Sequence, residues 1–316
     1  MSVLKAEEKR IYHLRLITSP PPHIHAAISV DKIVYWTIGS LMPAVLWVLY
    51  LFGWPALLVL SLCVGTAVLT EAACLKLRNK PLSLMDGTAV LTGLILALTL
   101  PPTVPFWAAM LGAVFAITIG KQVFGGTGCN PFNPAVVGRV FLAVSFPEQV
   151  SNWTLPFSGG TGVPSPMDLW KAGEALPGYQ SLLLGSTGSF MAEFAVVALV
   201  LGGLVLVAKG YVDWRIPLGM LAAVGIFMLL VGEDPLWHLL VGGLILGAFY
   251  LAGDPVTNPI TPWGRLVFGI GVGLFTVVMR YYGQNPDALF YAVLLMNGLT
   301  PMLNRFLRAK RRGAAI

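Results

Sequence analysis

Long blocks of apolar residues separated by short polar segments dominate this sequence. A hydrophobic stretch of roughly 17–25 residues can cross a lipid bilayer as a helix. Ten blocks approach this length, the fifth being short: 34–53, 56–75, 85–100, 105–122, 134–146, 190–208, 216–232, 236–252, 265–281 and 287–304. Pro and Gly interrupt several block ends, which favours tilted or broken helices inside the bundle. The pattern predicts an all-α polytopic membrane protein with about ten transmembrane helices.

The scarcity of charge excludes a water-soluble globule. Only 11% of the 316 residues are charged, against roughly 25% in soluble domains. A soluble protein of this size could not cover its surface with so few charges. The net charge of +6 does not indicate nucleic acid, because the basic residues form no solvated cluster beside a groove-reading element. The lipid bilayer is the expected partner, and nucleic acid is not.

The basic residues also predict an orientation. With the N-terminus in the cytoplasm and helices that alternate in direction, eighteen of the 20 Lys and Arg residues fall on the cytoplasmic side, Lys121 and Arg139 among them. Only Lys171 and Arg280 fall outside. Because positive residues are enriched in cytoplasmic loops, both termini are expected in the cytoplasm.

Two short matches indicate an internal repeat. The Gly-Leu-Ile-Leu segment 93–96 recurs at 243–246, and Gly-Cys-Asn-Pro at 128–131 has a counterpart, Gly-Gln-Asn-Pro, at 283–286. Both matches are five predicted helices apart, so the copies face opposite sides of the membrane, as in an inverted repeat. The expected organisation is a cytoplasmic segment 1–33, a five-helix repeat 34–146, an outer loop 147–189, a second five-helix repeat 190–304 and a basic cytoplasmic tail 305–316.

Several motifs carry a family resemblance that spans nearly the whole chain. They are Ser-Pro-Pro-Pro-His at 19–23, Asp-Gly-Thr-Ala-Val-Leu-Thr-Gly-Leu at 86–94, Leu-Pro-Pro at 100–102, Gly-Gly-Thr-Gly-Cys-Asn-Pro-Phe-Asn-Pro-Ala at 125–135, Leu-Gly-Ser-Thr-Gly-Ser at 184–189, Glu193, Asp-Pro-Val-Thr at 254–257 and Leu-Met-Asn at 295–297. With these motifs the chain resembles the RnfD family, the D component of the Rnf electron-transport complex, and its relative, the B component of the sodium-translocating NADH:quinone oxidoreductase.

The resemblance implies a redox component of a bacterial cytoplasmic-membrane complex. Such a complex couples electron transfer between ferredoxin and NAD to Na+ or H+ translocation, and the component is part of this translocase without being catalytic alone. The resemblance implies FMN on the outer face, a riboflavin at a subunit interface as a further cofactor, and other integral and peripheral Rnf subunits as partners. The sequence has no dinucleotide fingerprint and no iron–sulfur cysteine cluster, so NADH oxidation and ferredoxin contact are expected on those partners.

The outer loop offers two attachment points for FMN. In this family FMN is commonly joined through its phosphate to a threonine in a short motif. Alignment on the Pro-Met pair at 166–167 puts Ser165 at that position, whereas alignment on Ser-Gly-x-Thr puts Thr161 there. The upstream Asp of the motif is missing in both alignments. A phosphoester to Ser165, a phosphoester to Thr161 and noncovalent FMN therefore remain alternatives.

Gly185, Thr187 and Ser189 form a second group of candidate FMN contacts. They stand just before the predicted helix 190–208, where free N–H groups and the helix dipole attract a phosphate. The alternative is that Ser189 only caps the helix.

Acidic residues at membrane depth are costly and often mark ion pathways. Glu71, Asp86, Glu193 and Asp254 flank or enter predicted helices. Asp86, Glu193 and Asp254 fall in the family-like motifs and are the candidates for ion coupling, with a capping or solvated carboxylate as the alternative for each. The His and Cys residues lack metal-ligand spacing, so no metal is expected.

Two other classes of protein fit the same composition. Ten helices in an inverted repeat also suit a nonredox channel or small-solute transporter, and a structural scaffold for partner subunits is the third interpretation. Flavin on the purified chain favours the redox component, whereas solute uptake by flavin-free protein favours the transporter.

Overall fold

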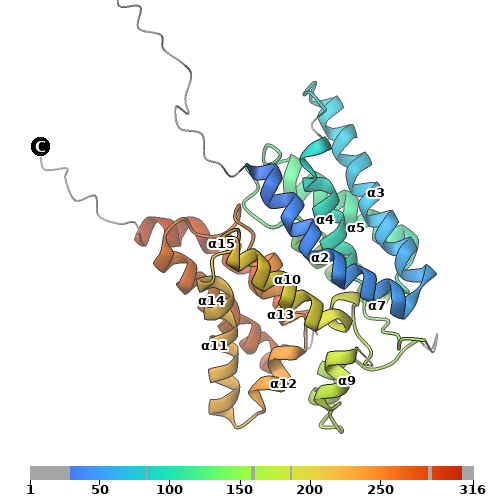
Figure 1. Ribbon diagram of the computed structural model, residues 1–316, viewed down its shortest axis with the longest axis vertical. Coiled ribbons are helices and arrows are strands. Elements are labelled where there is room, and N and C mark those ends of the chain that lie inside the picture. Colours follow the sequence, from blue (N-terminus) through green and yellow to red (C-terminus); the bar gives the residue numbers. More distant parts are fainter. Residues whose placement is uncertain (1–28, 83, 158–160, 186, 284–286, 308–316) are drawn as a thin grey trace, which may run out of the picture.

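The computed structural model describes residues 29–307, apart from 83, 158–160, 186 and 284–286. Within them the protein is a bundle of helices (Figure 1). These described residues form no strands, only isolated β-bridges that join Thr154 to Thr161 and to Ser189. Most of both expected terminal segments, 1–28 and 308–316, and the repeat motif at 284–286 lie outside the described residues.

The first half begins with two long helices and continues with shorter ones. They are α2 (Val30–Phe52), α3 (Trp54–Leu77), the 3-10 turn η2 (Leu84–Asp86), α4 (Thr88–Leu98), α5 (Phe106–Ile117), its π-helical continuation η3 (Thr118–Gln122) and α6 (Pro134–Ser145). Pro residues begin or nearly begin α3 and α6, where a missing N–H costs no intrahelical hydrogen bond.

The helices of the second half follow a folded connection. The connection contains α7 (Pro147–Val150), α8 (Pro166–Ala172) and α9 (Tyr179–Leu184), and then come η4 (Met191–Ala195), α10 (Val196–Ala208), α11 (Arg215–Val231), α12 (Pro235–Leu240), α13 (Leu244–Leu246), the π-helical η5 (Gly247–Leu251), α14 (Pro262–Tyr282) and α15 (Ala288–Phe306). In Figure 1, α2 begins and α15 ends at one end of the bundle, which we call the terminus end. The opposite end carries α9 and is called the loop end.

Four helical stretches are long and apolar enough to cross a membrane: Val30–Phe52, Trp54–Leu77, Met191–Ala208 and Pro262–Tyr282. Shorter apolar helices accompany them: Thr88–Leu98, Phe106–Gln122, Pro134–Ser145 and Arg215–Val231. Large apolar side chains such as Leu69, Leu201 and Leu230 are exposed on the surface, where a bilayer would cover them. The predicted all-α class is confirmed, and the apolar helices agree with a membrane protein.

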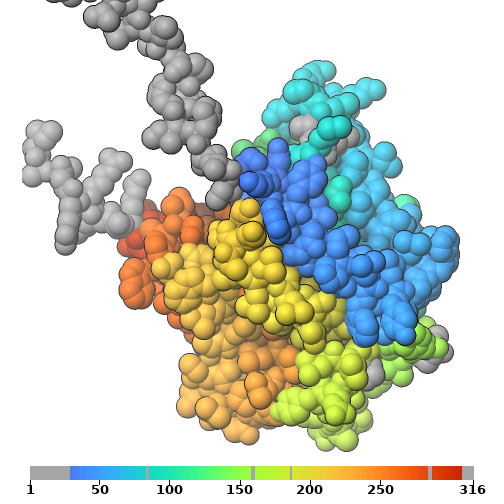
Figure 2. All heavy atoms as spheres, viewed as in Figure 1, coloured from blue at the N-terminus to red at the C-terminus, as the bar shows by residue number. Residues whose placement is uncertain are grey.

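The two halves pack directly on each other. α2 and α10 run side by side, as Figure 2 shows for the blue and yellow segments. Gly202 permits this contact, because a Cβ atom there would lie 2.3 Å from the backbone oxygen of Ser40. On the other side α6 packs against α15. The Met191 N–H also donates to the Leu100 carbonyl over 3.1 Å, so groups from both halves build one core.

The predicted helix 236–252 is broken in its middle. α12 ends at Leu240 and α13 begins at Leu244, and the intervening glycine pair, Gly242 and Gly243, has φ angles of 72° and 66°. Only glycine adopts these angles without strain. A break of this kind frees backbone N–H and C=O groups that need partners at membrane depth.

Three basic residues that the positive-inside count assigns to one or the other side of the membrane are buried in the protein. Lys121, Arg139 and Arg280 are each at most 2% exposed. They therefore pair with protein groups and do not report which side of a membrane they face. The charge bias persists without them, since Lys171 is then the one basic residue assigned outside.

The connection 147–189 is anchored to the second half and does not run free. Met167 of α8 and Leu182 of α9 share an apolar cluster with Trp237 and Val241. The indole N–H of Trp237 also donates to the Pro177 carbonyl over 3.2 Å. These contacts hold α8 and α9 against α12 at the loop end.

Asp213, between α10 and α11, provides a test of stability against pH. Its Oδ2 lies 3.1 Å from Arg215 Nη1 and 2.8 Å from Arg265 Nη1. Burial alone would raise the pKa of Asp213, but hydrogen bonds from Arg265 and from the Arg215 backbone outweigh burial and hold the pKa below its ordinary value. A carboxyl with a depressed folded pKa stabilises the fold above its unfolded pKa, and this stabilisation is lost as the pH falls through the folded pKa.

We therefore expect Asp213→Asn to lower the thermal midpoint most near neutral pH. The difference from wild type should shrink below about pH 4, where the unfolded carboxyl protonates. Thermal unfolding in detergent at a series of pH values measures this difference. A difference that stays constant across the series would contradict the assigned ion pairs.

Candidate functional site

A small pocket at the loop end brings together three residues predicted for FMN or ion contact. Ser165, Ser189 and Glu193 line this loop-end pocket, and its other walls come from Trp153, Met167, Phe190, Gly242 and Asp287. Its volume is about 10 Å³, which leaves room for about one water molecule. The predicted alternative attachment point, Thr161, is exposed and does not line the pocket.

Ser165 is the N-cap of α8 and is joined to Asp168. The Ser165 Oγ–H donates to Asp168 Oδ2 over 2.6 Å, and the same carboxylate oxygen accepts from the Ser165 backbone N–H over 3.0 Å. The Asp168 N–H in turn lies 3.2 Å from Ser165 Oγ. This reciprocal capping box satisfies backbone donors at the start of the helix. It fixes a hydroxyl beside a carboxylate, with Ser165 only 3% exposed.

The surroundings of Thr161 are different. Residues 158–160 before it lie outside the described part of the chain. Its backbone pairs with Thr154, and the Asn152 side chain accepts from the next N–H, that of Gly162, over 3.0 Å. Within the described residues no carboxylate bonds to the Thr161 hydroxyl. Ser165 is thus buried and its hydroxyl donates to a carboxylate, whereas Thr161 is exposed and its hydroxyl has no carboxylate partner among the described residues.

Glu193 faces the break between α12 and α13. Glu193 and Gly242 line the same loop-end pocket, so the carboxylate lies close to the glycine pair that precedes the second part of the broken helix. Arg280 donates to the carbonyls that end the first part, His238 O at 2.8 Å and Val241 O at 2.6 Å. A negative charge stabilises the N-terminus of a helix, and a positive charge stabilises the C-terminus. Glu193 and Arg280 together therefore stabilise the break.

One oxygen of the Glu193 carboxylate is not used in this arrangement. Glu193 is 7% exposed, and its Oε1 has no hydrogen-bond partner among the described residues. Ser189 lies close to the Glu193 carboxylate and also lines the loop-end pocket. A buried acid with an unpartnered oxygen can accept a proton or a cation.

Gly185, Thr187 and Ser189 take separate places. Gly185 ends α9 with a φ of 74°, and its backbone passes close to the backbone of Phe194. Ser189 is buried and bridges to Thr154, and the residue that precedes η4 as its N-cap is Phe190. Ser189 is therefore not the helix cap that the sequence pattern allowed as an alternative. Of the three, Ser189 is the one that reaches the loop-end pocket.

Gly185→Ala is expected to destabilise the protein more than Gly173→Ala. Both glycines have positive φ angles, 74° and 69°, so each Ala variant bears a backbone cost of about 1–2 kcal/mol. Only at Gly185 would the new Cβ meet backbone, 2.8 Å from the Phe194 Cα; nothing lies within 4 Å at Gly173. Thermal unfolding of both variants measures the comparison, and equal losses would contradict the packing described.

A larger cavity of about 310 Å³ lies between the two halves at the terminus end. Apolar side chains of α2, α4, α10 and η5 form much of this terminus-end cavity. Its polar lining consists of Thr37, Thr88, Thr92, Lys121, Thr127, Asn130, Asn133, Tyr211, Tyr250 and Asp254. The cavity therefore joins the Asn-Pro-Phe-Asn-Pro-Ala motif of the first half to the Asp-Pro-Val-Thr motif of the second.

Asn133 and Asp254 make this junction directly. The Asn133 Nδ2 donates to Asp254 Oδ2 over 3.4 Å and to the Leu251 carbonyl over 3.5 Å. The Asn133 Oδ1 accepts from the N–H groups of Ala135 and Val136, which makes Asn133 the N-cap of α6. A predicted ion residue is thus held by the start of a helix from the other half.

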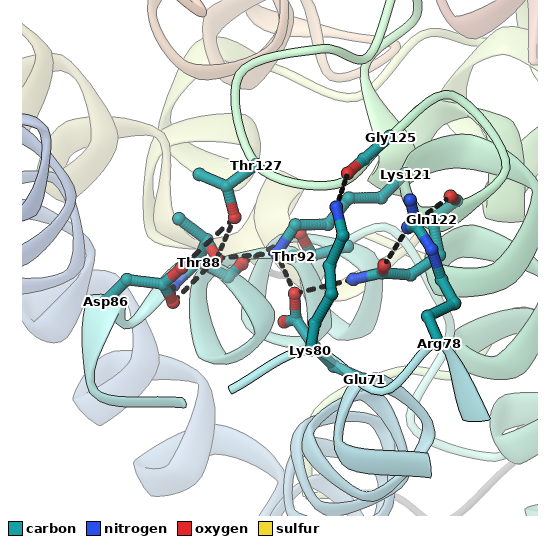
Figure 3. A network of polar contacts seen from close by, with 10 residues as sticks. All are labelled: Glu71, Arg78, Lys80, Asp86, Thr88, Thr92, Lys121, Gln122, Gly125 and Thr127. Atoms are coloured by element: carbon teal, nitrogen blue, oxygen red, sulfur yellow. Dashed lines mark hydrogen bonds and ion pairs between the residues drawn. The ribbon is translucent and has the colours of Figure 1, made fainter. Parts of the chain in front are cut away.

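Asp86 belongs to a polar network beside the same cavity (Figure 3). Its oxygens accept from the hydroxyls of Thr88 at 2.8 Å and Thr127 at 3.1 Å. Lys121 Nζ lies 2.6 Å from Thr88 Oγ1 and 2.6 Å from Glu71 Oε1. The ammonium group therefore connects the predicted residue Asp86, through Thr88, to the buried acid Glu71.

Glu71 is the centre of the buried part of this network. Gln122 Nε2 donates to Glu71 Oε1 over 2.9 Å, and Arg78 donates to the Gln122 side chain over 3.1 Å (Figure 3). Glu71 Oε2 has no hydrogen-bond partner within the described residues. In the sequence Glu71 stands out as an acid at membrane depth, but neither Glu71 nor Lys121 was predicted as a site residue. The signal that could have found this pair is a carboxylate inside the apolar block 56–75.

The fold and these two sites define a class of protein. It is a helical membrane-type protein with buried ionisable networks at both ends of the bundle and a folded connection at one of them. This class includes ion transporters and the membrane subunits of redox complexes. The described residues hold no group of three His, Cys, Asp or Glu placed to bind a metal ion.

Comparison with known proteins identifies the family. Residues 17–313 match the NQR2, RnfD, RnfE family, and the chain belongs to this family. It is 41% identical, over 95% of its length and 96% of the relative, to the D component of the Na+-translocating ferredoxin:NAD+ oxidoreductase complex of Acetobacterium woodii.

Two further relatives are similar over comparable lengths. The D component of the ion-translocating oxidoreductase complex of Stutzerimonas stutzeri is 42% identical over 90% of this chain and 92% of the relative. The D component of the proton-translocating ferredoxin:NAD+ oxidoreductase complex of Clostridium ljungdahlii is 37% identical over 93% of this chain and 95% of the relative.

Proposed function

We propose that this chain is the RnfD component of an Rnf-type ion-translocating ferredoxin:NAD+ oxidoreductase complex. The observation that carries the proposal is full-length similarity, 41% identity over 95% of the chain, to the D component of such a complex. In this role the chain works within a redox-driven translocase together with the other integral and peripheral Rnf subunits. Relatives named for Na+ and for proton translocation are both similar, so similarity does not select the ion.

The proposal includes ten transmembrane helices in two inverted five-helix repeats of a bacterial cytoplasmic-membrane protein. The two Gly-Leu-Ile-Leu copies support the repeat, because Leu94–Leu96 of α4 and Leu244–Leu246 of α13 are both buried in the core. The positive-inside bias assigns the terminus end, with both chain termini, to the cytoplasm. The loop end with α8 and α9 would then face outward.

FMN would be carried at the loop end. A phosphoester needs a hydroxyl, and Ser165 offers one that already donates to a carboxylate. Thr161 and a noncovalent site are the alternatives. The loop-end pocket, at about 10 Å³, cannot enclose an isoalloxazine ring, so the residues present fit the phosphate attachment and not burial of the ring. When bound, FMN supplies one-electron transfer.

The terminus-end cavity is the proposed site of a second flavin. Riboflavin has no phosphate, and the cavity combines apolar walls with the amide groups of Asn130 and Asn133, the mixture typical of sites for small organic ligands. We place riboflavin here, with a neighbouring subunit completing the site.

Ion coupling would use carboxylates at both ends of the bundle. Glu193 has an unpartnered oxygen at the loop end, while Asp254 lines the terminus-end cavity and Asp86 bonds to its lining residue Thr88. Carboxylate oxygens are suited to bind either Na+ or a proton. An ion would enter at one group and leave at the other.

Flavin analysis of the purified complex tests the proposed function. The chain is coexpressed with its complex and a flavin transferase, and flavin fluorescence is followed into the denatured band of this chain. We expect fluorescence on this chain. A chain without flavin, which instead takes up small solutes in flavin-free liposomes, would show that it is a transporter.

A further inference from the structure

The hydrogen bond between Ser165 and Asp168 suggests how FMN becomes attached. We propose that Asp168 is the general base that accepts the Ser165 hydroxyl proton when the flavin phosphate is joined to this chain. This inference rests on the proposed function as an FMN carrier. It goes further because it selects Ser165 over Thr161 and assigns a role to a residue outside the family motif.

The geometry meets the requirement for proton transfer. A serine hydroxyl is a weak nucleophile until an adjacent base receives its proton, and a base must lie within hydrogen-bond reach, about 2.6–3.2 Å. Asp168 Oδ2 lies 2.6 Å from Ser165 Oγ. The first turn of α8 fixes both groups through their backbone hydrogen bonds, so the pair is preorganised.

The sequence explains why the carboxylate stands at this position. The family-like attachment motif has an acidic residue upstream of the acceptor, and this chain lacks it. Asp168, three residues downstream, brings a carboxylate to the acceptor hydroxyl through the turn of a helix. Thr161 has no such partner within the described residues, so the two hydroxyls differ in activation.

The reaction balances with a flavin dinucleotide as the donor. The Ser165 Oγ forms a bond to the phosphorus that bears the riboflavin part, and the P–O bond of the diphosphate breaks. The nucleoside monophosphate leaves with the electron pair of that bond, and the Oγ proton moves to Asp168. No oxidation or reduction occurs. A flavin transferase would supply the donor and stabilise the leaving group.

The competing explanation is that Asp168 only completes the capping box, and a matched pair of variants separates the two roles. Glu and Gln both serve at the third position of a capping box. Asp168→Glu therefore keeps the box and the carboxylate, whereas Asp168→Gln keeps the box without the charge. Asp168→Asn is a second uncharged variant with a shorter side chain.

The experiment follows attachment itself and not electron transfer. The complex is purified from cells without the transferase and then incubated with transferase and FAD, and mass spectrometry of the peptide that holds Ser165 gives the initial rate of FMN incorporation. We expect wild type and Thr161→Ala to react at similar rates and Ser165→Ala not to react. Asp168→Gln and Asp168→Asn should be slower by about 100-fold, with Asp168→Glu clearly faster than both.

The outcomes that would overturn the proposal are distinct. FMN on Ser165 at an unchanged rate in assembled Asp168→Gln or Asp168→Asn would overturn the role of Asp168 and leave the FMN-carrier function standing. FMN on Thr161 would overturn the choice of hydroxyl. A wild-type chain that holds flavin only noncovalently would overturn the role of Ser165 and Asp168 and leave the FMN-carrier function standing. A wild-type chain that has no FMN on any residue and also releases no flavin on denaturation would overturn the FMN part of the proposed function itself. Gel filtration of each complex confirms assembly before its rate is compared.

Discussion

Arg139→Met is expected to destabilise the protein by about 3–5 kcal/mol of unfolding free energy, because it breaks a buried ion pair. Arg139 Nη2 lies 2.6 Å from Asp287 Oδ1, and the Arg139 side chain is 0% exposed. The guanidinium carbon also lies 5.4 Å from the centre of the Phe290 ring, a favourable cation–π distance. The pair joins α6 of the first half to the start of α15 in the second, so the variant should also weaken the contact between the halves.

A double variant and a surface control make this test specific. Arg139→Met combined with Asp287→Leu removes both charges, and we expect it to be more stable than Arg139→Met alone. Arg215→Met breaks the more exposed pair with Asp213 and should cost no more than about 1 kcal/mol. Thermal unfolding in detergent compares the four proteins. Arg139→Met and Arg215→Met with equal losses would contradict the buried pair.

Lys121→Met is expected to cost a similar amount, about 3–5 kcal/mol, at the other end of the bundle. It leaves the buried Glu71 carboxylate, 2% exposed, without its ammonium partner at 2.6 Å. It also removes the donor to Thr88, which connects this pair to Asp86 and the terminus-end cavity. The same unfolding measurement detects the loss.

Glu71→Gln is the matched comparison. The amide oxygen can still accept from Lys121 and from Gln122, so Glu71→Gln should be more stable than Lys121→Met. Adding Glu71→Gln to Lys121→Met removes the unpaired charge, and we expect part of the lost stability to return. If the two single losses instead add up in the double variant, the two groups do not interact as described.

The apolar blocks predicted most of the helices because burial in lipid requires long apolar stretches whatever the tertiary fold. The block 236–252 was predicted as one helix but contains a break at Gly242 and Gly243. The mean hydropathy of the block does not locate such a break. The break is stabilised by Glu193 and Arg280, which are distant in the sequence. Likewise, Lys121 and Arg139 were counted as cytoplasmic-side charges, because a sequence does not reveal a carboxylate that tertiary folding places beside them.

The motif residues predicted part of the candidate site. Ser165, Ser189 and Glu193 meet at one pocket, and Asp254 lines the larger cavity. Gly185 instead serves a tight chain crossing at Phe194. The partnership of Ser165 with Asp168 was not predicted, although Ser-x-x-Asp before a helix is a recognisable capping pattern. Its chemical meaning depends on the 2.6 Å contact, which the sequence alone does not give.

The central claim, that this chain carries FMN as the RnfD component of an Rnf-type complex, has one direct test. The complex is isolated from cells that contain a flavin transferase, and the segment 147–189 of this chain is analysed by mass spectrometry. We expect the added mass of FMN on the peptide, located at Ser165. An unmodified segment, in a chain that also releases no flavin on denaturation, would contradict the claim.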